Sequence, residues 1–460
     1  MSLKHVFTLF FISLFYSNSL TFQDNIFRKS LENNPNKNIM ISPYSLYKIL
    51  SLLSNGSTGN TRKEILELLY PDKEIDDSIL EKMNSKIYES NSNIQSEDEI
   101  DDSNPKQCSG GDCKVTFKEA NAIFMRDSIK LQDEFKKICD NYNNSYFELV
   151  DVDQVNNFCK EKTEGKIDHI IDQITDLTQM LLVNALLFKG TWEKKFDGVY
   201  TNKQDFLNSD NTTVKVDTMF QFFEHTMYFE DEKAQIISLP YISNKLETKM
   251  IIIKPNLAKY SSALDFLDKE KIIFSEIELK LEYTENVNLY LPKFIYKSNF
   301  DIKKVLKDLG MISAFDSSKA TLDYILKGSY VGQFLHKTFI DLNENGTEAS
   351  ASTVAEIKAN GTLSDKEYHM HINNSFIFMI QSDKINDIDD NYLMPFIGIV
   401  NNLKESNEPD TDNSTTRISN GDETNDTSLD DEPVKIPNYG MNFKINLLIN
   451  ISLMALLLSL

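Results

Sequence analysis

Glycine is scarce in this chain, with 15 in 460 residues, and no two glycines are separated by a single residue. This excludes the Gly-rich loops of dinucleotide-binding proteins and kinases. Gly165 and Lys166 are followed by isoleucine and lack the upstream glycine of a phosphate-binding loop. Gly328 and Gly332 flank Tyr330, where a hydrolase elbow needs serine. We therefore expect no catalytic residue and no enzyme activity.

Histidine and cysteine are also few, at 6 and 4 residues. No His-Glu-x-x-His motif occurs and the cysteine spacing fits no zinc site. His369 and His371 would share one face of a strand, but no third ligand stands nearby, so we expect no metal and no cofactor.

The four cysteines leave their pairing partly open. Cys108 and Cys113 enclose a Ser-Gly-Gly-Asp turn, which predicts a local disulfide. Cys139 and Cys159 are equally compatible with a second bridge and with two free thiols.

Basic residues are outnumbered, 48 Lys+Arg against 70 Asp+Glu, for a net charge of −22. Nucleic acid is therefore excluded as a partner. The acids concentrate in two irregular stretches, which predict an inserted acidic loop over 91–114 and a disordered acidic stalk over 404–440. The full chain is 41% hydrophobic, enough for a large folded core.

Both ends of the chain have apolar runs. Residues 1–19 combine Lys4, an apolar run and small polar residues, which predicts a cleaved secretory signal; a buried N-terminal helix is the alternative. The hydrophobic tail over 441–460 has an apolar stretch of only ~24 Å as a helix. It predicts a lipid-anchor (GPI) signal, with a retained membrane span as the alternative. We expect a protein that is secreted or on the cell surface, in contact with a membrane only through this tail or anchor.

Glycosylation sequons are frequent, so a secreted form would be a glycoprotein. We expect glycans on the asparagines of sequons predicted to lie on the surface, and none on those in packed or reactive segments. The first group is Asn143, Asn211, Asn413 and Asn425, and the second is Asn55, Asn345 and Asn360.

Residues 20–403 read as one α+β domain. Helical spacing over 22–69 predicts three helices, and further helices are expected over 133–142 and 302–309. Strands are expected over 115–125, 181–188, 249–254, 288–294, 334–342 and 376–380.

One segment departs from ordinary loop composition. After a predicted strand, small residues without bulk or charge run from Ala349 to Ser352. Such residues suit a segment that slides between existing strands, although composition alone equally fits a flexible Ser/Ala linker.

At this point the chain closely resembles the serpins, through almost the whole core. The matching motifs are Asn38-Ile-Met-Ile-Ser-Pro-Tyr-Ser45-Leu, Gly56-Ser-Thr-Gly59-Asn-Thr61, Thr163-Glu-Gly165-Lys-Ile167, Val183-Asn184-Ala-Leu-Leu-Phe188-Lys-Gly190-Thr-Trp192, Leu291-Pro-Lys-Phe294, His336-Lys-Thr-Phe339, Asn343-Glu-Asn-Gly346-Thr347, Phe376-Ile-Phe378 and Phe396-Ile-Gly398.

The resemblance implies a serpin fold, with three β-sheets, about eight or nine helices and an exposed reactive-centre loop over 343–370. It implies a monomeric protease inhibitor that acts as a suicide substrate. The target endopeptidase forms an acyl-enzyme with the loop, and the cut loop then inserts into the main sheet and traps it. The alternative is a non-inhibitory serpin-fold protein that binds ligands or mediates surface interactions.

The resemblance also assigns roles to individual residues. The hinge of the loop comprises Glu344, Gly346, Thr347, Glu348, Ala349, Ser350, Ala351, Ser352 and Thr353. The cluster at the opening point of the sheet comprises Ser42, Ser45, Asn184, Trp192 and His336.

The usual family distance from the hinge predicts the scissile bond between Asn360 and Gly361. This bond suits an asparagine-cleaving cysteine protease. Lys358 and Ala359 form the alternative bond, which suits a trypsin-like serine protease, and a longer loop leaves Leu363 open. The helix before Thr163 is shorter than the family pattern, which leaves the efficiency of trapping open.

Overall fold

The computed structural model describes residues 20–71, 73–95, 115–126, 131–175, 178–243, 247–298, 301–347, 366–382, 394–404 and 410–411. All of them belong to one contact unit, Met1–Thr415. The described helices are α2 (Phe22–Asn33), α3 (Pro43–Gly56), α4 (Gly59–Leu69), α5 (Asp77–Gln95), α6 (Asp133–Asn141), α7 (Val152–Lys162), α8 (Ala263–Lys269) and α9 (Ile302–Asp308), with 3-10 turns η3 (Gly198–Tyr200), η4 (Phe274–Lys280) and η5 (Ser313–Phe315).

Local sequence fixes where the important helices begin. Helix α3 starts after Ser42, whose side chain accepts a hydrogen bond from the Ser45 amide, and Pro43 occupies the first turn. Asp151 caps α7 in the same way through the Gln154 amide. These caps satisfy backbone amides that a helix start leaves without partners.

One sheet holds seven strands in the order β16-β10-β11-β12-β4-β2-β3. Its strands are β2 (Thr116–Met125), β3 (Ser145–Glu148), β4 (Met180–Thr191), β10 (Phe294–Lys297), β11 (Val331–Asn343), β12 (Gly346–Thr347) and β16 (Asp410–Thr411). At its centre β4 and β11 run parallel, from the pair Met180 and Val331 to the pair Leu187 and Phe339. We call this β4–β11 contact the seam.

The second sheet has nine strands, in the order β1-β15-β14-β8-β7-β6-β9-β13 with β5 paired to β6. Its strands are β1 (Ile39–Ile41), β5 (Asn202–Leu207), β6 (Thr213–Glu230), β7 (Ala234–Pro240), β8 (Thr248–Pro255), β9 (Glu282–Pro292), β13 (Tyr368–His371), β14 (Phe376–Ser382) and β15 (Phe396–Val400). The resemblance implies three sheets. Hydrogen bonding groups the described strands into two, because the 18-residue β6 pairs with β5 and β9 and also, at its end, with β7.

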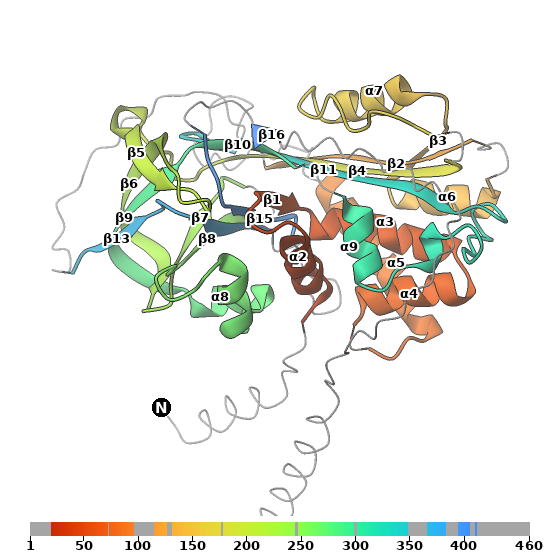
Figure 1. Ribbon diagram of the computed structural model, residues 1–460, viewed down its shortest axis with the longest axis horizontal. Helices are drawn as coiled ribbons and strands as arrows, with labels where there is room; N and C mark the ends of the chain where they lie inside the picture. The colour runs from red at the N-terminus through yellow and green to blue at the C-terminus, as the bar shows by residue number, and fades with distance from the viewer. Residues whose placement is uncertain are drawn as a thin grey trace, which may run out of the picture. The chain divides into compact units, whose positions relative to one another are not determined.

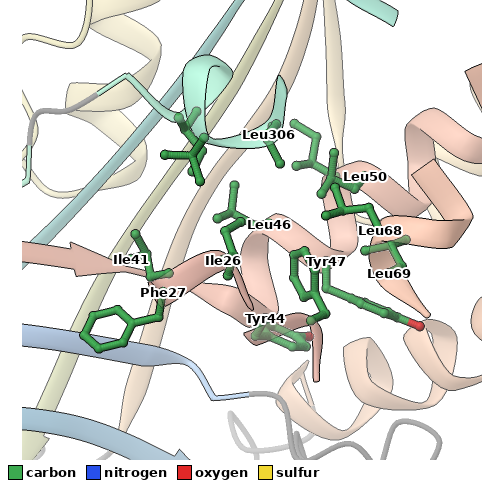
Figure 2. Packing of buried hydrophobic residues seen from close by; sticks show 14 of the residues in the cluster. Ile26, Phe27, Ile41, Tyr44, Leu46, Tyr47, Leu50, Leu68, Leu69 and Leu306 are labelled. Carbon is green, nitrogen blue, oxygen red and sulfur yellow. The ribbon is translucent and has the colours of Figure 1, made fainter. Parts of the chain in front are cut away.

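The seven-stranded sheet lies between two helical layers. Helices α3, α4, α5, α6 and α9 lie on one side of it and α7 on the other (Figure 1). Strand β2 shows why both faces are apolar: Ile123 and Met125 join the core on the α3 side, whereas Ala122 and Phe124 join the core beneath α7. Figure 2 shows the first of these cores, where Tyr44, Leu46 and Leu50 of α3 pack with side chains of neighbouring elements.

Most predicted elements occur, with differences that have local causes. The region predicted as three helices also contains the short strand β1, which pairs with β15 near the other end of the domain sequence. The stretch predicted as one strand over 288–294 is divided at Lys293 between β9 and β10, which belong to different sheets.

Two described elements fall within the segments predicted as an acidic loop and as a stalk. Helix α5 continues to Gln95, so the predicted loop cannot begin at residue 91; a formed helix adds one hydrogen bond per residue even where the apolar pattern has ended. Within the predicted stalk, β16 pairs in parallel with Tyr296 and Lys297 of β10. The remainder of both segments, with Cys108 and Cys113, lies outside the described residues.

Cys139 and Cys159 are free and buried. They lie in cores on opposite faces of the seven-stranded sheet, which settles the alternative left open by the sequence. Burial raises the pKa of both thiols to about 12, so neither is a reactive thiolate. Within the described part of the chain, no helix has the length and apolar character needed to cross a membrane; residues 1–19 and 441–460 lie outside that part.

Candidate functional site

The seam ends in a two-residue wedge. Strand β12 lies between the ends of β4 and β11 and is antiparallel to both. Thr347 pairs with Gly190 on one side and Leu342 on the other, and Gly346 pairs with Thr191 and Asn343. Two hinge residues, Gly346 and Thr347, therefore already occupy the position of an additional strand at one end of the seam.

Backbone geometry at the wedge requires glycine. Gly346 has a φ of 149°, and a Cβ added there would lie 2.0 Å from the carbonyl oxygen of Gly190. A Cβ on Gly190 would lie 2.7 Å from the ring of Tyr241. Both glycines allow the three strands to approach at this point.

The turn before the wedge is held by side chains and backbone. Nζ of Lys293 lies 2.9 Å from a carboxylate oxygen of Glu344, which also accepts a hydrogen bond from Thr201. Partial burial acts against ionisation, but the bonds from Lys293 and Thr201 prevail and lower the pKa of Glu344. The amide of Phe196 donates to the carbonyl of Glu344 at 2.9 Å.

An aromatic pair lies beneath the hinge. The rings of Trp192 and Tyr241 stack with centroids 4.4 Å apart, and the indole Nε1 donates to the carbonyl oxygen of Asn343 at 3.1 Å. The Tyr241 hydroxyl lies 2.7 Å from Oγ1 of Thr347, whose side chain is fully buried. Trp192 is the single tryptophan of the chain, so its fluorescence reports on the hinge.

A buried polar cluster crosses the seam farther along β4 and β11 from β12. Nδ1 of His336 on β11 donates to Oδ1 of Asn184 on β4 at 2.6 Å, and Nε2 accepts from the Ser42 amide at 3.2 Å. Asn184 in turn donates to the Ser45 hydroxyl at 2.5 Å and to Asn121 at 2.7 Å. The imidazole is therefore neutral, and burial lowers its pKa to about 3.

The predicted site residues that the structure describes lie in one region. Glu344, Gly346, Thr347 and Trp192 meet at the wedge, and Ser42, Ser45, Asn184 and His336 meet at the seam. The other predicted positions lie outside the described residues: Glu348, Ala349, Ser350, Ala351, Ser352, Thr353, Lys358, Ala359, Asn360 and Gly361.

Sequence reasoning missed Asn121, Tyr241 and Lys293. Asn121 had a usable signal, because it alternates with the apolar Ile123 and so faces the same core as α3. Tyr241 and Lys293 had none, since each reaches the hinge from another part of the fold.

His369 and His371 lie on the edge strand β13, where the His371 ring stacks on Tyr290 at 4.0 Å. In the part of the chain that the structure describes, no group of three or more His, Cys, Asp or Glu side chains could hold a metal ion.

The protein thus has an α+β fold whose seven-stranded sheet contains a parallel seam, with Gly346 and Thr347 of the segment after β11 already paired between the seam strands. The family model described as Serpin (serine protease inhibitor) matches residues 17–400. The chain belongs to the serpin family.

Relatives agree with this assignment over most of their length. The leukocyte elastase inhibitor of Xenopus tropicalis is 28% identical over 386 residues, which cover 80% of this chain and 95% of that protein. Antichymotrypsin-2 of Bombyx mori is 27% identical over 378 residues, covering 79% and 94%.

Solved structures share the fold. The thermophilic serpin Tengpin in its native state matches with a TM-score of 0.69 at 26% identity, covering 84% of this chain and 93% of that chain. A thyroxine-binding globulin complex with thyroxine matches with a TM-score of 0.67 at 22% identity, covering 85% and 99%, which is a likeness of fold alone.

Proposed function

We propose that the protein inhibits an endopeptidase as a suicide substrate. The protease cleaves the loop over 343–370 and is held as an acyl-enzyme while the cut loop enters the seam as a new strand. The inhibitor supplies no catalytic residue; the protease's own nucleophile forms the ester or thioester, and insertion prevents its hydrolysis. Relatives that carry inhibitor names, such as the leukocyte elastase inhibitor, support this proposal.

The observation that carries the proposal is the register of β12. Thr347 is aligned with both Gly190 and Leu342, so the path of an incoming strand is defined from both sides. If that register continued, Thr353 would arrive level with Asn184 and His336, which are themselves paired in the closed seam. Thr353 would take the place of their contact across the seam.

The sequence of the loop fits this path. Side chains alternate along a strand, so the residues that would point toward α3 with Thr347 are Ala349, Ala351 and Thr353. All are small and uncharged. The charged Glu348 would point to the opposite face, near the entrance of the seam.

The target class follows from the residue before the scissile bond. Cleavage after Asn360 suits an asparagine-cleaving cysteine protease, and cleavage after Lys358 suits a trypsin-like serine protease. We further propose that the protein acts as a monomer outside the cell, secreted or held on the surface by a lipid anchor, and carries glycans. Release from cells by a phosphatidylinositol-specific phospholipase supports the anchor, and retention rejects it.

The deciding experiment incubates the protein with trypsin and with an asparagine-cleaving cysteine protease. Trapping gives a complex that survives denaturing electrophoresis, and sequencing the released C-terminal peptide identifies the bond. A cleaved form without any complex, and with an unchanged melting temperature, rejects inhibition in favour of a non-inhibitory binding protein. Cleavage outside residues 358–364 rejects the assigned bonds.

A further inference from the structure

A buried ion pair joins α3 to β2 beside the seam. Nζ of Lys48 lies 2.7 Å from Oε2 of Glu119, and the two side chains are 3% and 9% exposed. Lys48 stands in the apolar sequence between Tyr47 and Ile49 of α3, where packing alone would favour an apolar residue. Two charges at such a depth are costly to bury unless each is paired.

The pair belongs to a closed circuit of hydrogen bonds. Oε2 of Glu119 also accepts from Asn121 at 3.0 Å, and Asn121 accepts from Asn184 at 2.7 Å. Asn184 accepts from His336, which accepts from the Ser42 amide. The circuit thus leaves α3 at Ser42, crosses β11, β4 and β2, and returns to α3 at Lys48.

Opening the seam must break this circuit. An additional strand moves β4 away from β11 by about 4.8 Å, more than any hydrogen bond can stretch. Strand β2 moves with β4, since the two are paired along the whole of β2 from Thr116 to Met125.

Helix α3 is tied to the other half. It follows β1, whose Met40 carbonyl accepts from Thr338 of β11 at 3.0 Å, and its Ser42 amide bonds His336 of the same strand. When β4 and β2 shift together, the contacts of α3 with both strands are therefore stretched, among them the bond from Asn184 to Ser45 and the Lys48–Glu119 ion pair.

We propose that Lys48 and Glu119 are positioning residues that hold β2 on α3 and thereby set the rate at which the seam opens for a new strand. This inference rests on the proposed function and adds to it a determinant outside the hinge. Among the described residues Oε1 of Glu119 has no hydrogen-bond partner. An unpaired buried carboxylate oxygen costs free energy. The pair therefore stabilises the closed sheet less than a fully hydrogen-bonded ion pair would.

The test measures how fast the intact protein takes up a synthetic peptide with the sequence of residues 347–358. Trp192 fluorescence follows the uptake, and the melting temperature of the product confirms it. The test variant is Lys48→Met combined with Glu119→Gln, which removes both charges and keeps the volume. The matched control, Lys233→Met with Glu270→Gln, removes an ion pair at 2.6 Å between the residue before β7 and the residue after α8, in elements outside the seam.

We expect uptake about tenfold faster in the Lys48/Glu119 double variant and unchanged in the control. The single variant Lys48→Arg retains the positive charge opposite Glu119 and should take up peptide at the wild-type rate. If only packing at residue 48 mattered, this variant would also change the rate. If the double variant does not fold, Glu119→Gln alone decides, because glutamine can still accept from Asn121; its uptake should also be faster.

The two failures are distinguishable. A wild-type protein that takes up peptide and gains stability, together with a variant of unchanged rate, overturns the role of the ion pair and leaves the inhibitor intact. A wild-type protein that neither takes up peptide nor gains stability on loop cleavage overturns the proposed function, and the ion-pair role with it.

Discussion

His336 and Asn184 hold the two halves of the main sheet together across its seam, with 2.6 Å between Nδ1 of the histidine and Oδ1 of the asparagine. Nε2 of the same ring accepts from the Ser42 amide, so both nitrogens of the neutral imidazole have a hydrogen-bond partner. Protonation at Nε2 would set a second hydrogen against that amide. Protonation of His336 would therefore destabilise the closed seam.

This arrangement predicts a dependence on pH. Burial lowers the pKa of His336 to about 3 from its usual 6.5, so the unfolded chain binds the proton more readily than the folded one. The stability contribution is fully present above pH 6.5 and is lost as the pH falls toward 3, by about 2 kcal/mol at pH 5. Urea unfolding at several pH values measures it.

The control for the pH effect is a histidine elsewhere. His336→Gln should flatten the pH profile between 6.5 and 3, whereas His225→Gln, at an exposed position on β6, should leave it as in the wild type. Equal profiles for wild type and His336→Gln would show that His336 does not control this transition.

A second prediction concerns the wedge. Thr347 is fully buried in β12 and hydrogen-bonded to Tyr241, so Thr347→Arg would place an unpaired charge at the end of the seam at a cost of several kcal/mol, before and after insertion. Insertion should slow while loop cleavage continues, and the stoichiometry of inhibition should rise at least about tenfold. Titration of a fixed amount of protease measures it.

Thr347→Ser is the matched variant, because serine is small and retains the hydroxyl. It should inhibit as the wild type does. A Thr347→Arg protein that still forms complexes at the original stoichiometry would show that the burial of residue 347 in β12 does not control insertion.

The sequence predicted the parts of the fold that depend on local pattern. Strand β4 and helix α9 fall where apolar periodicity placed them, and the glycine at 346 stands where three backbones converge. It did not predict Lys293, Tyr241 or Glu119 as part of the site. Their roles depend on which elements meet in space, and a charged residue in a strand gives no sign of its partner on a distant helix.

A third prediction tests how the turn before the wedge is anchored. The Lys293 and Glu344 side chains are 24% and 18% exposed, between the surface and buried limits for ion pairs. Glu344→Gln should lower stability by about 1 kcal/mol, and Glu344→Lys by more, since it places two cations together. Thermal unfolding measures both.

A variant with the two charges exchanged tests whether the Lys293–Glu344 attraction itself contributes to stability. Glu344→Lys combined with Lys293→Glu should recover part of the stability that Glu344→Lys loses. No recovery would mean that Glu344 acts through its bond from Thr201 rather than through Lys293.

The last prediction concerns glycans. Asn55 is 8% exposed, and its amide nitrogen donates to the Ser51 carbonyl and to Asn84. A glycan on that nitrogen would remove these bonds and would have to leave through packed helices. Asn143 and Asn211, by contrast, are exposed at turns with φ values of 51° and 65°. Glycopeptide mapping of protein from a secretory host should find Asn143 and Asn211 occupied and Asn55 bare, and a glycan at Asn55 on folded, active protein would contradict the packing around α3.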